Sequence, residues 1–102
     1  MLLYLTELVQ GIPKNIYKDI NIACSRDEEI LLDCTGAQLV LSTLIGVIVG
    51  LKKVIQSQNG LTRFRVIEVE ENLFDTLEVC GLTSVLIIEK VAKKQKFTQK
   101  NN

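Results

Sequence analysis

The sequence contains no histidine, and this absence removes the commonest kinds of enzyme site. Without an imidazole there is no Ser-His-Asp triad, no Cys-His pair and no histidine-based metal site. Catalysis would have to come from carboxylates, lysine, tyrosine or cysteine alone, and these residues form no suggestive cluster. No G-x-G-x-x-G or Walker A pattern is present. We therefore expect a protein that is not an enzyme, with no metal site and no cofactor.

Cysteine is scarce and irregularly spaced. The three cysteines, Cys24, Cys34 and Cys80, form no C-x-x-C pair and so predict neither a zinc site nor a redox motif. They are better explained as small buried apolar residues in a reducing compartment. The first ten residues lack a basic stretch and include Glu7, which is unlike a signal peptide. These features predict a cytoplasmic protein.

Net charge and long hydrophobic runs are also lacking. The formal net charge is zero, which argues against nucleic acid as the main partner. The most apolar segment, residues 39–51, ends at Lys52 and Lys53 after thirteen residues. A membrane-spanning helix needs about twenty residues, and shorter runs are more often buried core helices. We expect no direct insertion into a membrane.

The composition indicates one globular domain. The 102 residues are 47% hydrophobic and 24% charged, a balance that supports a buried core without disulfides or metals. Short apolar runs, which predict strands, alternate with segments of helical periodicity. The expected strands are residues 2–8, 29–34, 62–69 and 84–89, and the expected helices follow Pro13, begin at residues 42–43, and span 71–80. This order predicts an α/β fold with a four-stranded, mainly parallel sheet and helices packed on it.

The middle helix has the clearest pattern. Its apolar residues recur on one continuous face: Leu44, Val47, Ile48, Leu51 and Ile55. Either of the adjacent hydroxyl residues, Ser42 and Thr43, fits its N-cap. Gly46 and Gly50, four residues apart, are interpreted as packing positions within it. Gly60 and Gly81 suit left-handed residues after the second and third helices.

The C-terminal residues differ in charge from the rest. Residues 1–89 hold twelve acidic and seven basic residues, a net charge of −5, whereas residues 90–102 hold five lysines and no acid. We predict a domain over residues 1–89 and a Lys-rich tail over residues 90–102 that is solvated, with a helical start at Val91. Docking of this tail on an acidic surface is the alternative.

Ser42 and Thr43 are the candidate functional residues. In a parallel α/β sheet, ligands and partners meet the carboxyl ends of the strands, where loops lead into helix N-termini. A helix N-terminus has free N–H groups and a partial positive charge, so it tolerates a phosphate. A phosphate there would repel an acidic or apolar partner docked on the same surface. The simpler interpretation is that the two hydroxyls only cap the helix.

The stretch "LLDCTGAQLVLSTLIGVIVGLKKVIQSQNG" resembles the STAS domain, the sulfate transporter and anti-sigma factor antagonist family. Members show L-D-L-S-G at the end of a strand, then D-S-S-G-L at the head of a helix that ends in G-G or N-G. The corresponding positions here are residues 32–36, 41–45 and 59–60. Residues 71–89 resemble the last helix and strand of the family, so the resemblance covers residues 29–89 well and residues 2–24 loosely.

This resemblance implies a non-catalytic bacterial signalling module that switches partners. In anti-sigma factor antagonists a phosphorylated hydroxyl of this motif controls binding to a serine kinase that is also the anti-sigma factor. The phosphorylated position corresponds to Thr43 or, in the stressosome branch, to Ser42. The implied partner-binding residues are Asp33, Thr35, Leu41, Ser42, Thr43 and Leu44.

Two departures from the motif favour an alternative. Leu41 replaces its aspartate and Leu44 replaces its glycine. Both changes make the surface more apolar and suit steady contact. The alternative is therefore a constitutive STAS subunit of a transporter or a stressosome-like complex, without phosphoregulation.

A third departure concerns the N-terminus, where we expect the chain to lack the additional first strand of the family. We expect one sheet edge, that of Ile30–Cys34, to be bare. Bare edges recruit partners, so this edge would be covered by a second copy in a homodimer, by another protein or by the Lys-rich tail.

Overall fold

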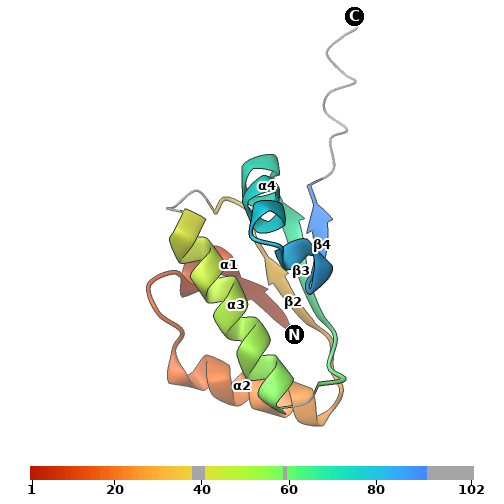
Figure 1. Ribbon diagram of the computed structural model, residues 1–102. Coiled ribbons are helices and arrows are strands. Elements are labelled where there is room, and N and C mark those ends of the chain that lie inside the picture. Colours follow the sequence, from red (N-terminus) through yellow and green to blue (C-terminus); the bar gives the residue numbers. More distant parts are fainter. Residues whose placement is uncertain (38–40, 59, 92–102) are drawn as a thin grey trace, which may run out of the picture.

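The computed structural model describes residues 1–37, 41–58 and 60–91, with the side chain of Leu41 left out (Figure 1). Its strands are β1 (Leu2–Tyr4), β2 (Ile30–Asp33), β3 (Phe64–Val69) and β4 (Ile87–Lys90). Its helices are α1 (Leu5–Leu8), α2 (Lys14–Ser25), α3 (Leu41–Gln58) and α4 (Glu71–Val79), with a 3₁₀ turn, η1 (Leu82–Ser84), before β4.

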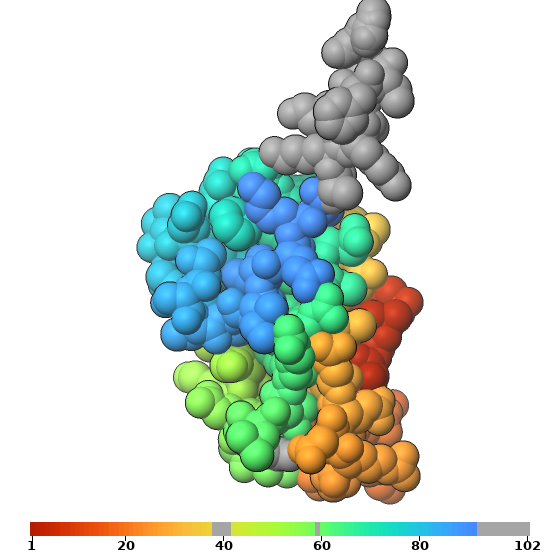
Figure 2. Space-filling model, turned by 90° about the vertical axis from the view of Figure 1, so that its right-hand side faces the viewer, coloured from red at the N-terminus to blue at the C-terminus, as the bar shows by residue number. Residues whose placement is uncertain are grey.

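The sheet has the order β1-β2-β3-β4, and every neighbouring pair is parallel. This confirms the predicted α/β fold with a four-stranded parallel sheet. Successive strands are neighbours, and parallel crossovers are right-handed, so the connecting helices lie on the same face of the sheet. Figure 1 shows α2, α3 and α4 on that face. Figure 2 shows the opposite face, where β4, β3, β2 and β1 follow one another across the surface in blue, green, orange and red.

All four strands are shorter than expected, and helical turns take up part of the predicted range of the first and the last. The first strand ends at Tyr4, and residues 5–8 form a helical turn that buries Leu5 and Leu8, three residues apart. The last strand begins at Ile87, not at residue 84, because the chain first forms η1. The predicted end of α4 is correct, since Gly81 adopts a left-handed φ of 76°.

The prediction of a bare edge at Ile30–Cys34 was wrong. Strand β2 pairs with β1 on one side and with β3 on the other, in register from Leu2 opposite Leu31 to Asp33 opposite Ile67. The short N-terminal strand β1 supplies the neighbour that β2 was expected to lack. The edges of the described sheet are therefore β1 and β4, and a homodimer through β2 is excluded.

Helix α3 packs across the sheet through the predicted face. One residue from each successive turn of the helix is buried: Leu44, Ile48, Leu51 and Ile55. Two other expectations about this helix fail. The helix begins at Leu41, so Ser42 and Thr43 lie inside the first turn and neither is the N-cap. Gly46 and Gly50 are not close-packing positions, since no described neighbour lies within 4 Å of a Cβ placed at either residue.

The start of the predicted tail belongs to the sheet. Lys90 is the last residue of β4, and the backbone N–H of Val91 donates to the carbonyl of Val69 at 3.0 Å. Val91 has no regular secondary structure, and the rest of the predicted tail, residues 92–102, lies outside the described residues. None of the described helices is both long and apolar enough to cross a bilayer.

Candidate protein-interaction site

The two adjacent hydroxyls lie at the carboxyl end of the sheet. Ser42 and Thr43 occupy the first turn of α3, and both are exposed. Figure 1 shows the strands pointing toward the end of the molecule at which α3 begins. This placement agrees with the expectation from the sequence that the pair marks an accessible helix N-terminus, at the edge where parallel α/β proteins meet their ligands.

A hydrogen-bonded turn at the end of β2 forms the neighbouring part of this surface. The backbone N–H of Thr35 donates to the Asp33 carboxylate at 2.8 Å, and the N–H of Ala37 donates to the carbonyl of Cys34 at 3.1 Å. Gly36 has a φ of 74°, which matches the third position of a type II turn. Asp33 therefore holds the turn in shape, while the exposed Thr35 is free to face a partner.

The first turn of α3 favours negative charge. Its leading N–H groups have no partner within the helix, and the aligned peptide dipoles give this end a partial positive charge. The first turn contains no acidic residue. A phosphate on Ser42 or Thr43 would thus meet a favourable local field, and it would stand on the surface without displacing a buried group.

The structure brings together most of the predicted site residues. Asp33, Thr35, Ser42 and Thr43 belong to the end of β2, the turn after it and the start of α3. Leu44 was wrongly assigned to the partner-binding surface, because its side chain is fully buried. It lies one residue after Thr43, where the rotation of the helix turns the side chain into the core. The side chain of Leu41 lies outside the described part of the structure.

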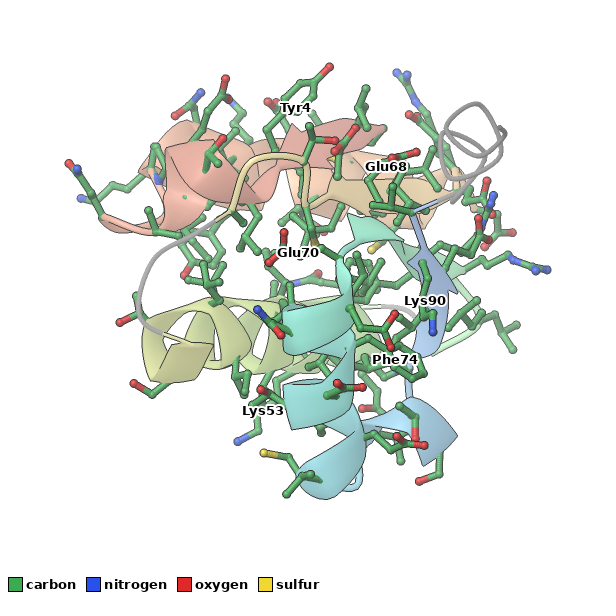
Figure 3. The ribbon with its side chains drawn as sticks, turned by 90° about the horizontal axis from the view of Figure 1, so that it is seen from above. Tyr4, Lys53, Glu68, Glu70, Phe74 and Lys90 are labelled. Atoms are coloured by element: carbon green, nitrogen blue, oxygen red, sulfur yellow. The ribbon has the colours of Figure 1, made fainter. Side chains whose placement is uncertain are left out.

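Sequence reasoning missed three residues at the same end of the sheet (Figure 3). Tyr4 is 43% exposed and stands opposite Asp33 in the sheet register. Glu68 has a left-handed φ of 56° at an irregularity in the pairing of β3 with β4, and Glu70 is the N-cap of α4. Tyr4 could have been found only by recognising that its strand ends there. No sequence signal marks the strained backbone at Glu68.

Cys34, within the D-C-T-G turn, is not a reactive nucleophile. Its side chain is buried, and its thiol points toward the carbonyl of Leu32 at 3.9 Å. Burial, with a smaller contribution from the nearby Asp33 charge, raises the pKa of Cys34 from 9.0 to about 12. The neutral thiol is therefore the form that persists near neutral pH.

The raised pKa of Cys34 predicts alkaline sensitivity. Below pH 9 the thiol is neutral in both folded and unfolded chains, so its contribution to stability is complete. As the pH rises from 9 toward 12, the unfolded chain ionises first and the folded state loses stability. Urea unfolding across this pH range should show a smaller loss of the free energy of unfolding for Cys34→Ala than for the wild type. Cys80→Ala, which alters an exposed cysteine, should lose stability with pH as the wild type does. If the free energy of unfolding fell equally steeply with pH in all three proteins, the raised pKa of Cys34 would be contradicted.

These features define a small parallel α/β domain with helices on one sheet face and polar side chains gathered at the strand ends. No group of residues suited to holding a metal ion occurs in residues 1–37, 41–58 and 60–91.

The fold is that of a STAS domain. The solved structure of an anti-sigma-factor antagonist (STAS) domain protein from Planctomyces limnophilus matches 97% of this chain and 81% of that chain, with a TM-score of 0.59 and 18% sequence identity. Comparison with protein-family models and with curated proteins gave no match.

Proposed function

We propose that this protein is a cytoplasmic, non-catalytic regulatory module of the anti-sigma factor antagonist type. Its partner would be a serine kinase that also acts as an anti-sigma factor, as the sequence resemblance implies. The observation that carries the proposal is the exposed pair Ser42 and Thr43 in the first turn of α3, at the carboxyl end of a STAS-like sheet.

The binding surface in this proposal is smaller than the sequence suggested. It contains Thr35, Ser42 and Thr43, with Asp33 fixing the turn that presents Thr35, and without the buried Leu44. Leu41, whose side chain lies outside the described structure, remains a predicted member. Exposed Tyr4, opposite Asp33 in register, extends this surface across the end of β1. Aromatic side chains are common anchors in protein interfaces, so Tyr4 gives the surface an apolar contact beside its hydroxyls.

Phosphorylation would act by charge and not by unfolding. A phosphate adds roughly −1.5 to −2 charges at neutral pH. On the first turn of α3 this charge is compatible with the helix, and its typical effect is a stabilisation of about 0.3–1 kcal/mol. A partner docked over the same turn, however, would have to make room for the phosphate and strip its hydration water. Phosphorylation should therefore stabilise the fold slightly and weaken partner binding.

The proposal predicts that phosphate occurs on Ser42 or Thr43 in the native host. Protein purified in the presence of phosphatase inhibitors should show this modification by peptide mass spectrometry. The Ser42→Glu or Thr43→Glu variant should bind the copurifying kinase at least about tenfold more weakly than the corresponding alanine variant. Neither glutamate variant should unfold more easily than the wild type.

A constitutive STAS subunit is the second candidate function. It is favoured by the first turn of α3, which has no acidic residue where the family motif has aspartate. In this case no phosphate would be found on either hydroxyl, and the glutamate variants would still copurify with a transporter ATPase or a scaffold protein. That combination of results would overturn the switch and leave the binding role in place.

A further inference from the structure

A groove of about 430 Å³ lies between α3 and η1, on the face of the sheet that the helices cover (Figure 1). One wall is a single face of α3, with residues spaced at i, i+3, i+4 and i+7: Val49, Lys52, Lys53 and Gln56. The other wall is aliphatic and comes from η1 and the two residues after it: Leu82, Val85 and Leu86. We call this feature the α3–η1 groove.

The wall that η1 provides presents aliphatic surface to the groove. Leu86 is buried and Leu82 is half-buried, whereas Val85 is 56% exposed. None of the described residues that line the groove is aromatic. A nucleotide base or another planar ring would therefore find no side chain on which to stack. An alkyl chain needs only aliphatic contact, because each methylene that leaves water favours binding.

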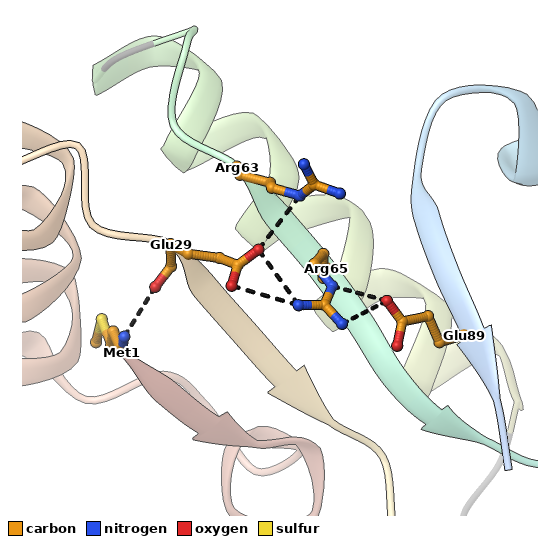
Figure 4. Close-up of polar contacts among 5 residues, drawn as sticks. All are labelled: Met1, Glu29, Arg63, Arg65 and Glu89. Carbon is orange, nitrogen blue, oxygen red and sulfur yellow. Dashed lines mark hydrogen bonds and ion pairs between the residues drawn. The ribbon is translucent and has the colours of Figure 1, made fainter. Parts of the chain in front are cut away.

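The wall that α3 provides carries two cations without a carboxylate partner. Lys52 is half-buried and Lys53 is exposed, and neither forms an ion pair with another described residue. Arg65, by contrast, is held between Glu29 and Glu89 (Figure 4). The domain outside the Lys-rich tail has a net negative charge, so two adjacent unpaired lysines form a local positive site on it.

The donors in the groove indicate which kind of anion it suits. Residues 52–56 lie in the interior of α3, where the backbone N–H groups are already bonded within the helix. The described lining also contains no arginine. Free N–H groups and arginine are the donors on which phosphate sites typically rely. Two ammonium groups beside the Gln56 amide instead match one carboxylate, which can accept about four hydrogen bonds.

We propose that the α3–η1 groove binds a fatty acid monomer, with its carboxylate at Lys52 and Lys53 and its alkyl chain along Leu82 and Val85. The volume of the groove falls in the range of about 300–1,000 Å³ that is typical of small-ligand sites. A stable protein partner would need roughly 20–30 contact residues, whereas seven described residues line the groove. The site lies about 15 Å along α3 from Ser42, so the inference does not depend on the proposed switch.

Titration of sodium decanoate into the ¹⁵N-labelled full chain, followed by NMR, tests this site. The backbone amide signals of Val49, Lys53 and Val85 should shift and saturate at one ligand per chain. For a ligand of about twelve non-hydrogen atoms we expect a dissociation constant between about 0.1 and 1 mM. Each added methylene should tighten binding about two- to fourfold, because the exposed Val85 leaves the chain only partly covered.

Variants separate the two walls of the groove. The Lys52→Gln/Lys53→Gln double variant removes both cations and should raise the dissociation constant of decanoate at least about tenfold. Val85→Asp places a charge on the aliphatic wall and should have an effect of similar size. The matched control is Lys14→Gln/Lys18→Gln, which removes two exposed lysines from α2 and should leave binding as in the wild type. Circular dichroism checks that each variant is folded.

The site is supported if decanoate binding saturates and is weakened by the groove substitutions but not by the α2 control. It is overturned if no saturable binding occurs up to about 5 mM decanoate. It is also overturned if both double variants bind decanoate equally, or if 1-decanol binds as tightly as decanoate, because the two lysines then select no carboxylate. If a synthetic acidic amphipathic peptide shifted the same signals and decanoate did not, the groove would be a protein-docking site and the fatty acid would be excluded.

Discussion

Replacing Leu44 by alanine is expected to lower the free energy of unfolding by about 2–5 kcal/mol. Leu44 is fully buried among the core side chains of α3, and alanine would leave a cavity as well as lose apolar contact. A small domain has a total stability of about 5–15 kcal/mol, so this single change would remove a large fraction of it. Urea denaturation of the purified variant measures the effect directly.

Thr43→Ala is the matched control for this prediction. Thr43 is the adjacent residue on the same helix and is exposed, so its replacement should change stability by no more than about 0.5 kcal/mol. The pair of variants distinguishes the buried Leu44 of the structure from the surface Leu44 expected from the motif. If Leu44→Ala were as stable as the wild type but weakened partner binding, the structural assignment would fail.

Replacing both Gly46 and Gly50 by alanine should raise the free energy of unfolding by about 1–2 kcal/mol. Glycine within a helix is less favourable than alanine by roughly 0.5–1 kcal/mol per residue, because its backbone loses more entropy on folding. Both residues lie inside α3, and a Cβ at either position meets no described neighbour within 4 Å. A thermal or urea unfolding curve is sufficient to detect a gain of this size.

The same substitution at Gly36 should have the opposite sign. Gly36 has a φ of 74°, where a Cβ adds strain of about 1–2 kcal/mol even though space is available. Gly36→Ala should therefore destabilise the domain while Gly46→Ala and Gly50→Ala stabilise it. If all three changes had the same sign, backbone conformation would not be the deciding factor.

The sequence predicted the middle of the fold better than its ends. The periodicity from Leu44 to Ile55 is local and strong, and the structure buries the same face. The N-terminal run at residues 2–8 is too short for periodicity to tell a strand from a helix, and the chain forms both there. The first strand was predicted, but its pairing with β2 was not, because contacts between segments far apart in the chain leave no local pattern; β2 was therefore mistaken for an edge.

The sequence placed the candidate site at the correct end of the sheet, but it did not identify every residue there correctly. The adjacent hydroxyls Ser42 and Thr43 were visible because they interrupt an apolar run, whereas Asp33 and Thr35 entered only through the family resemblance. Two conflicting predictions for Leu44 followed from the sequence: the motif alignment placed it on the partner surface, whereas the helical periodicity placed it on the core face. The structure buries Leu44, in agreement with the periodicity.

By itself, the sequence determined the parallel α/β class, the core face of α3 and the accessible position of Ser42 and Thr43, because each follows from local periodicity, turn chemistry and strand-helix alternation. Only the tertiary structure decided which of the described strands lie at the edges of the sheet and that Arg65 pairs with Glu29 and Glu89. These features depend on pairing between segments far apart in the chain, and the free energy of that pairing has no local signature in the sequence.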